Sequence, residues 1–101
     1  STLQLIQGGS SSKTGSDNTS PGYTIKDEKV IGNYTAGDVA MANGGPGHPN
    51  TGGAQFFICT GDNSKLLTPN YTIFGHVTSG LDVALKISPD DVVKTVTIQV
   101  K

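Results

Sequence analysis

Few side chains in this sequence could do covalent or metal chemistry. The 101-residue chain has one cysteine, Cys59, and two histidines, His48 and His76, that are distant from each other along it. Cys59 ends the apolar run FFIC, where a thiol usually serves as a small buried hydrophobe, and no adjacent residue supplies the base that a reactive thiolate needs. One thiol and two separated histidines are too few for a structural zinc site. We therefore expect no metal, no cofactor and no catalytic nucleophile.

The glycine-rich residues 44–47 (GGPG) could be considered as a phosphate-binding loop. Loops of that kind continue into Lys-Ser/Thr and the N-terminus of a helix, whereas here Pro49 follows. The stretch is therefore predicted to be a surface loop, with His48 solvated within it. His76 lies in an alternating segment, and we expect it to be partly buried or at the surface.

Charge and hydropathy exclude two classes of partner. Seven lysines, no arginine and eight acidic residues give a net charge of −1, whereas nucleic-acid-binding domains carry a basic patch, usually with arginine. No apolar run approaches the roughly 18 residues that span a bilayer, and the opening STLQLIQ lacks the basic flank and apolar core of a signal peptide. We expect neither a nucleic-acid partner nor a membrane partner.

The elements that must position any functional residues are mainly strands. Hydrophobic residues make up 34% of the chain and charged residues 15%, both below the usual values of roughly 45–50% and 25%. Apolar runs and alternations predict strands, and a segment bounded by Ser79-Gly80 and Ser88-Pro89 predicts one short helix. The predicted strands cover residues 3–7, 39–42, 55–60, 71–77 and 92–101, and the helix lies near 80–87.

Long loops separate these elements. Residues 10–22 contain no large apolar side chain, and residues 43–53 are rich in glycine and proline, so both stretches are predicted to be loops. Five strands and one short helix predict a single, mainly β domain, either a barrel or a sandwich. Because the chain opens partway through a strand and closes on one, the predicted sheet keeps an unpaired edge.

Four motifs occur in an order that resembles one protein family. They are residues 6–9 (IQGG), 41–46 (MANGGP), 53–60 (GAQFFICT) and 71–77 (YTIFGHV). Together they resemble the cyclophilin family of peptidyl-prolyl cis-trans isomerases, and most closely its bacterial, actinobacterial-type members. The resemblance extends through PGY at 21–23 with Asp27-Glu28, and through GLDV at 80–83.

The resemblance implies a fold and an activity. The fold would be a cyclophilin-like antiparallel β-barrel, incomplete at its N-terminal side, with residues 1–101 as a single domain that forms the C-terminal portion of the family domain. The activity would be isomerisation of Xaa-Pro bonds in protein folding, on proline-containing peptides or unfolded proteins. Neither a cytoplasmic nor an extracytoplasmic location is favoured.

The resemblance also assigns substrate-binding residues, motif by motif. Gln7 matches the glutamine of the strand that lines the proline site, and Leu5 matches the apolar residue two positions earlier. Ala42 and Asn43 match the pair whose backbone binds the substrate peptide as an added strand.

The remaining assignments concern the walls of the proline pocket. Gln55 and Phe57 match its polar guide and its aromatic floor. Leu67 and Tyr71 match its far wall, with Tyr71 at the position where many eukaryotic members have histidine. Plain packing into the core is the alternative interpretation for each of these apolar side chains.

Two departures from the family pattern shape the expected function. In the family, an arginine upstream of the Gln-Gly-Gly strand donates to the prolyl amide, but this chain has no arginine and such a segment would precede Ser1. Leu66 stands where many members have the tryptophan that contacts cyclosporin, so we expect cyclosporin binding to be weak if it occurs at all.

Two hypotheses follow from these departures. The first is an isomerase portion that becomes active when an N-terminal complementing segment is supplied, and no catalytic residue is assigned within the chain itself. The second is a proline-peptide binding module without useful catalysis. In both cases the unpaired edge predicts either binding of the complementing segment or self-association.

Overall fold

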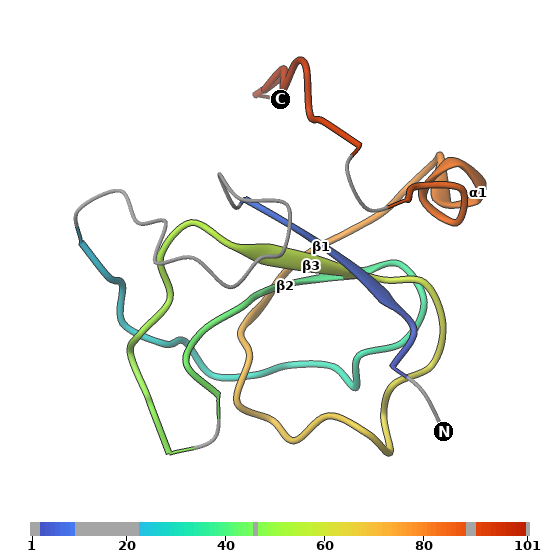
Figure 1. Cartoon of the computed structure of the whole chain (residues 1–101). Helices are drawn as coiled ribbons and strands as arrows, with labels where there is room; N and C mark the ends of the chain where they lie inside the picture. Colours follow the sequence, from blue (N-terminus) through green and yellow to red (C-terminus); the bar gives the residue numbers. More distant parts are fainter. Residues whose placement is uncertain (1–2, 10–22, 46, 89–90, 101) are drawn as a thin grey trace.

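The computed structural model describes residues 3–9, 23–45, 47–88 and 91–100. Their centre is one antiparallel sheet of four short strands (Figure 1). The loop predicted for residues 10–22 lies outside the described residues. The strands are β1 (Leu5–Gly8), β2 (Asp38–Met41), β3 (Phe56–Cys59) and β4 (Ile73–His76).

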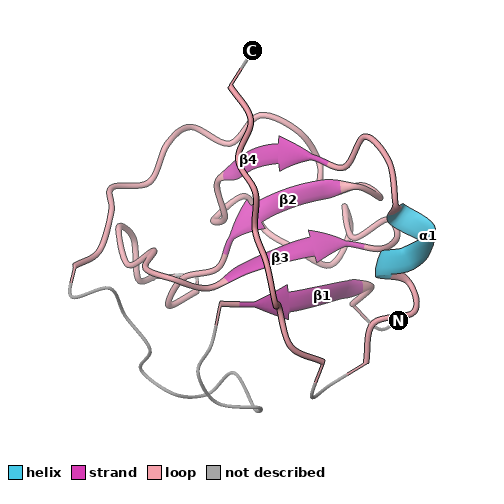
Figure 2. Cartoon of the chain, turned by 90° about the horizontal axis from the view of Figure 1, so that it is seen from above, coloured by secondary structure: helices cyan, strands magenta, loops and turns pink. Residues whose placement is uncertain are grey.

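The strands lie side by side in the order β1-β3-β2-β4 (Figure 2). The sheet is not closed into a barrel, since β1 and β4 stand at its two edges. The four corresponding strand predictions are confirmed, each with ends shifted by one or two residues. A mainly β architecture with one short helix is likewise confirmed.

Alternation along the strands gives the sheet one well-buried face. In β3, Phe57 and Cys59 are buried while Phe56 and Ile58 are half-buried on the other side. Cross-strand neighbours share a face in an antiparallel sheet, so Ala40, which pairs with Phe57, lies on the buried side. The register between β2 and β4 shifts between Val39 and Ala40, a local bulge in the ladder.

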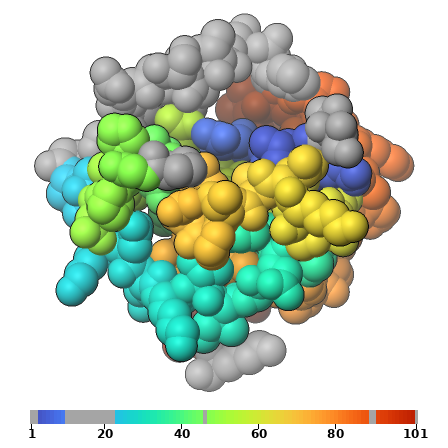
Figure 3. Space-filling view, turned by 90° about the horizontal axis from the view of Figure 1, so that it is seen from below, coloured from blue at the N-terminus to red at the C-terminus, as the bar shows by residue number. Residues whose placement is uncertain are grey.

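The buried face is covered by loop segments rather than by a long helix. The core consists of Tyr34, Ala40, Phe57 and Cys59, and Tyr34 comes from the segment that precedes β2. Figure 3, which views the molecule from this side, shows the segment before β2 and the segments between β3 and β4 spread across the face. Partly buried residues that pack against this core are Leu5, Val30, Ala42, Leu67, Tyr71 and Ile73.

The helix is shorter than its pattern suggested. α1 covers Leu81–Ala84 and follows Gly80, whose φ of 89° favours a residue without a Cβ atom. Helical hydrogen bonds continue as turns as far as Ile87. Ala84 is the one residue of α1 that is buried, so the helix contributes little to the core.

The strand predicted for residues 92–101 is wrong for the residues that the structure describes. Residues 91–100 form no strand, and every one of them is exposed, with Val96 at 77% and Ile98 at 83%. Alternation of β-branched residues records a preference for extended backbone, but a strand needs a partner to complete its hydrogen bonds. Figures 1 and 2 show this segment on the side of the sheet away from the covering loops.

Two features of the structure bear on the function classes considered above. Within the described ranges, no helix has the length and apolar character of a membrane span. Over the same ranges, no three His, Cys, Asp or Glu side chains come together as a metal site.

Candidate peptide-binding site

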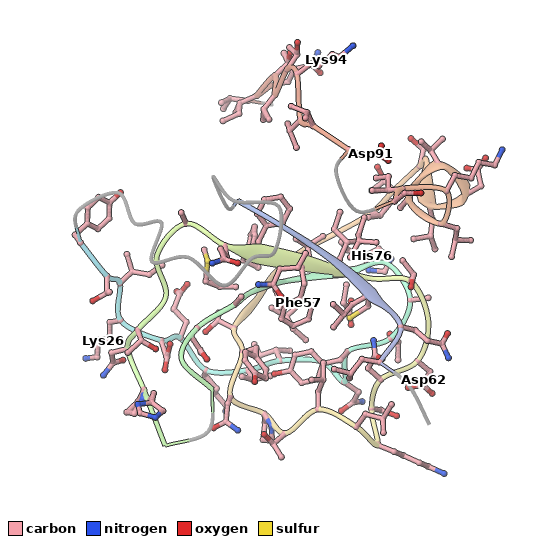
Figure 4. All side chains as sticks on the ribbon, viewed as in Figure 1. Lys26, Phe57, Asp62, His76, Asp91 and Lys94 are labelled. Atoms are coloured by element: carbon pink, nitrogen blue, oxygen red, sulfur yellow. The ribbon has the colours of Figure 1, made fainter. Side chains whose placement is uncertain are left out.

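Three aromatic rings meet on the buried face of the sheet. We call Tyr34, Phe57 and Tyr71 the aromatic cluster. The centroids of Phe57 and Tyr71 are 5.6 Å apart with their planes at 82°, an edge-to-face contact, and Tyr34 lies 6.4 Å from Phe57 and 6.3 Å from Tyr71. Such geometry is favourable for aromatic pairs. Figure 4 shows the labelled Phe57 directed from β3 toward the covering segments.

The hydroxyl group of Tyr34 holds the backbone of Tyr71. It donates a hydrogen bond to the Tyr71 carbonyl oxygen at 2.7 Å and accepts one from the Tyr71 N–H at 3.1 Å. Burial raises the pKa of the Tyr34 phenol, although the hydrogen bond to Tyr71 acts in the opposite direction. We call this pair of hydrogen bonds the tyrosine clamp.

Two glutamine side chains meet beside the aromatic cluster. The Gln7 side-chain NH₂ donates to the side-chain oxygen of Gln55 at 2.7 Å. Gln7 pairs with Phe57 across β1 and β3, so the two side chains share one face of the sheet. Gln7 is exposed and Gln55 is half-buried, which places a polar, accessible pair next to a buried aromatic ring.

The loop after β2 is fixed to the segment that carries Tyr71. The Asn43 side-chain NH₂ donates to the Asn70 carbonyl oxygen at 2.7 Å, and the Asn43 side-chain oxygen accepts from the Gly45 N–H at 2.7 Å. A Cβ atom built on Gly45 would lie 3.9 Å from the Tyr71 hydroxyl. The glycine loop therefore approaches the outer end of the Tyr71 ring.

The comparisons with known proteins fit this arrangement. The model of the family "Cyclophilin type peptidyl-prolyl cis-trans isomerase/CLD" matches residues 2–101. The chain belongs to this family. A similar protein is peptidyl-prolyl cis-trans isomerase B of Bacillus subtilis (strain 168), which is 42% identical over 97 residues, or 94% of this chain and 64% of the relative.

A second relative gives the same result. A peptidyl-prolyl cis-trans isomerase of Helicobacter pylori (strain ATCC 700392 / 26695) is 37% identical over 96 residues, which cover 91% of this chain and 55% of that protein. The chain thus spans between about half and two thirds of the length of these curated relatives.

The structure brings the eight predicted substrate-binding residues of this cyclophilin-type chain into one neighbourhood. Phe57 is 3% exposed, and Leu5, Ala42, Leu67 and Tyr71 pack on the cluster that contains it. Asn43 is tied to Asn70, next to Tyr71, and the two glutamines contact each other. Their role in binding a peptide remains a prediction.

Two residues of this neighbourhood were not predicted from the sequence. Tyr34 lies in a polar stretch with no strand pattern, and its φ of 58° is unusual for a residue with a side chain. Asn63 is fully buried; its side chain accepts from the Gln4 N–H at 2.7 Å and donates to the Gln4 carbonyl at 2.9 Å. The signal for Tyr34 was a lone large aromatic residue between polar neighbours.

The structure gives Cys59 and His76, which were first considered for covalent and metal chemistry, surroundings that do not favour either role. Cys59 is fully buried, and burial raises the pKa of its thiol, with a hydrogen bond to Asn63 as a smaller, opposite effect. His76 is at the surface, where its Nδ1 lies 3.1 Å from an oxygen of Asp38. The neighbourhood therefore offers aromatic contact and hydrogen bonds.

A separate pocket lies where residues 25–28 approach the ends of β2 and β4. It has a volume of about 150 Å³ and includes Met41 and Phe74. Met41 pairs with Phe56, so it projects away from the side on which Phe57 lies. This pocket is not part of the candidate site.

Proposed function

We propose that this chain is the peptide-binding portion of a prolyl cis-trans isomerase, which holds an Xaa-Pro segment and accelerates rotation about its prolyl amide. The observation that carries the proposal is that an edge-to-face aromatic pair, Phe57 and Tyr71, lies on the same face of the sheet as a hydrogen-bonded glutamine pair, with Gln7 directly across from Phe57. In this proposal residues 1–101 act as one domain, the C-terminal portion of the family domain.

The reaction makes modest demands on chemistry. The barrier to rotation about an Xaa-Pro amide is about 20 kcal/mol, and it comes from the partial double bond that keeps the amide planar. No bond between heavy atoms breaks, so neither a nucleophile nor a metal is required. A catalyst must bind the twisted amide better than it binds either planar isomer.

Such a catalyst needs an apolar surface for the prolyl ring, polar groups that hold the flanking backbone, and a hydrogen-bond donor to the prolyl nitrogen. The described residues supply the first two. In the twisted state the amide loses its conjugation and its charge separation, so an apolar surface such as the Tyr71 ring favours it over the planar forms. Tyr71 is half-buried while Phe57 is almost wholly buried, so Tyr71 receives the prolyl ring and Phe57 supports it from below. Gln7 and Gln55 supply amide groups for the backbone on either side of the proline.

The third demand, a hydrogen-bond donor aimed at the prolyl nitrogen, is not met by an arginine of this chain, which has none. Loss of one preorganised donor typically lowers a rate by about 10²–10³-fold. This observation favours a second candidate function, a proline-peptide binding module with little catalysis of its own. Within the first proposal, an N-terminal complementing segment restores the donor.

The two candidates are separated by measuring binding and turnover on the same sample. Peptide binding is followed by amide chemical shifts during titration with an Ala-Pro peptide, and turnover by protease-free exchange spectroscopy of the cis and trans forms. We expect shifts around Ala42, Asn43 and Gln55 with weak turnover by the chain alone. Turnover that rises when the N-terminal segment of a related cyclophilin is added supports the isomerase.

Other outcomes contradict one or both candidates. Binding with no gain in turnover on complementation supports the binding module against the isomerase. Turnover by the chain alone within tenfold of an intact cyclophilin contradicts the need for a complementing segment. Shifts confined to His48 or to residues 94–101 would place the binding surface elsewhere and overturn both.

Cyclosporin provides a further test of the partner class. We propose weak binding at most, because Leu66 stands where many family members have tryptophan. Leu66 is 41% exposed, so a Leu66→Trp substitution is tolerated by the fold and is expected to strengthen cyclosporin binding. An unchanged affinity would contradict this assignment.

A further inference from the structure

One hydroxyl group holds both backbone groups of Tyr71, and this arrangement recurs at the next residue. The Thr72 hydroxyl donates to the Glu28 carbonyl at 3.1 Å and accepts from the Glu28 N–H at 3.1 Å. In the tyrosine clamp, the hydroxyl belongs to Tyr34 and the held residue is Tyr71. The tyrosine clamp holds Tyr71, a candidate binding residue. The Thr72 hydroxyl holds Glu28, which is not one.

The clamp determines where the Tyr71 ring stands. Tyr34 is 2% exposed and its ring packs against Phe57, so its hydroxyl is held in a fixed place. The bridge joins residues 37 apart in the sequence, and Tyr71 itself lies outside the regular elements, because β4 begins at Ile73. The adjacent carbonyl of Asn70 is held separately by Asn43.

We propose that Tyr34 is a positioning residue of the peptide-binding site, whose hydroxyl fixes the Tyr71 backbone so that the Tyr71 ring stands edge-to-face on Phe57 and can receive a prolyl ring. The inference rests on the proposed function, because it assigns a role within that same site. Tyr34 does not touch the peptide. Small displacements of groups that position a substrate are costly, so loss of the clamp weakens binding without removing any contacting side chain.

The test compares two variants that each lose one bridging hydroxyl. Tyr34→Phe keeps the buried ring and removes the clamp, and Thr72→Val removes the neighbouring bridge to Glu28. With an Ala-Pro peptide, we expect Tyr34→Phe to raise the Kd about three- to tenfold, because neither hydrogen bond of the clamp then holds the Tyr71 ring in place. Thr72→Val should leave the Kd within about twofold of that of the unmodified chain.

Two further measurements separate positioning from general destabilisation. The Tyr71 amide should exchange with solvent slowly in the unmodified chain and faster in Tyr34→Phe, while the Cys59 amide at the end of β3 stays unchanged. A Tyr71→Phe variant, which keeps the clamp, should retain slow exchange at residue 71. If the unmodified chain exchanges this amide as fast as the denatured chain does, the clamp is absent in solution and the inference is overturned.

The outcomes also separate this inference from the proposed function. If the unmodified chain binds no Ala-Pro peptide, the proposed function fails and the inference fails with it. If the unmodified chain binds and Tyr34→Phe binds equally well, only the positioning role is overturned. The positioning role is also overturned if Tyr34→Phe and Thr72→Val raise the Kd by equal factors.

Discussion

The surroundings of the Cys59 thiol keep it protonated. The side chain is fully buried, and burial raises its pKa. The Tyr34 phenol is affected in the same way, because its pKa is also raised chiefly by burial. Both groups therefore retain their protons in the folded chain at pH values where the unfolded chain has lost them.

This difference predicts how stability depends on pH. A group with a raised folded-state pKa contributes stability below its unfolded pKa, about 8.5 for Cys and 10 for Tyr, and that contribution disappears as the pH rises through the folded pKa. We expect the urea midpoint to fall above about pH 8.5. Cys59→Ala should remove the first part of the fall and Tyr34→Phe the later part. A midpoint that stays constant to about pH 11, beyond the unfolded pKa of both groups, would contradict both assignments.

Phe57 offers a test of packing with a matched control in the same chain. Phe57 is 3% exposed between Tyr34 and Tyr71, whereas Phe74 is 56% exposed on β4. We expect Phe57→Ala to lower the free energy of unfolding by about 3–5 kcal/mol and Phe74→Ala to lower it by much less. Urea unfolding of both variants checks this, and equal losses would show that Phe57 does not belong to the core.

At the residue scale, the ordered sequence motifs were enough to predict the side chains that lie near Phe57. They did not predict the residues whose hydrogen bonds fix the surrounding backbone. Gln7, Gln55 and Tyr71 stand in ordered motifs next to strands, where register determines the neighbours. Tyr34 and Asn63 act through hydrogen bonds to backbone groups 37 and 59 residues away. A local pattern contains no information about partners at that distance.

Between the elements, Asn63 joins three parts of the fold. Its side chain satisfies both backbone groups of Gln4 just before β1, and its own N–H donates to the Tyr34 carbonyl. Its carbonyl oxygen accepts from the N–H of Leu67, one of the candidate binding residues. The turn between β3 and β4 is thereby attached to the edge strand and to the aromatic cluster.

We expect removal of the Asn63 side chain to lower the free energy of unfolding. Asn63→Ala removes the acceptor of the Gln4 N–H, whereas the Gln4 carbonyl keeps its hydrogen bond from the Thr60 N–H. The loss of such a partner costs up to about 1–3 kcal/mol when the backbone group is left unsatisfied. Asn63→Asp keeps the acceptor but not the donor, so we expect it to destabilise the chain as well. Lys65→Ala, at an exposed position of the same turn, is the control, with an expected change within about 0.5 kcal/mol. Asn63 variants as stable as this control would refute the attachment.

Strand prediction succeeded where a partner exists and failed where none does. β3 was predicted from an apolar run with two aromatics, and it lies between β1 and β2 in the middle of the sheet. Residues 92–101 have a regular alternation of apolar residues, yet residues 91–100 form no strand pairing with the described part of the chain. The hydrophobic pattern shows which backbone conformation a segment prefers, whereas strand formation also requires a neighbouring strand with free backbone groups.

Over the whole molecule, two open sheet edges and several exposed apolar side chains favour association. β1 and β4 each pair on one side among the described residues, and Val96, Ile98 and Val100 are between 77% and 92% exposed. Edge strands and exposed apolar segments promote association. We expect the chain alone to self-associate, with a sedimentation coefficient that rises with protein concentration.

Two manipulations test this expectation. Ile98→Lys should reduce self-association with little change in the free energy of unfolding, because the side chain is exposed. Addition of the N-terminal segment of a related cyclophilin should raise the melting temperature and replace self-association. A monomer with a sharp, concentration-independent transition above about 60 °C would show instead that the chain is self-sufficient.

The strand order also determines how the chain can assemble in time. In the order β1-β3-β2-β4, Leu5 pairs with Cys59, and the nearest pairing along the chain is between β2 and β3. Pairing strands that are far apart in the sequence costs loop-closure entropy before any contact forms, which slows folding. We therefore expect β2 and β3 to pair first. On the ribosome, β1 is synthesised before β3, the strand with which it pairs among the described residues. The β1 strand therefore has to wait for its partner while β2 and the two long intervening segments are synthesised.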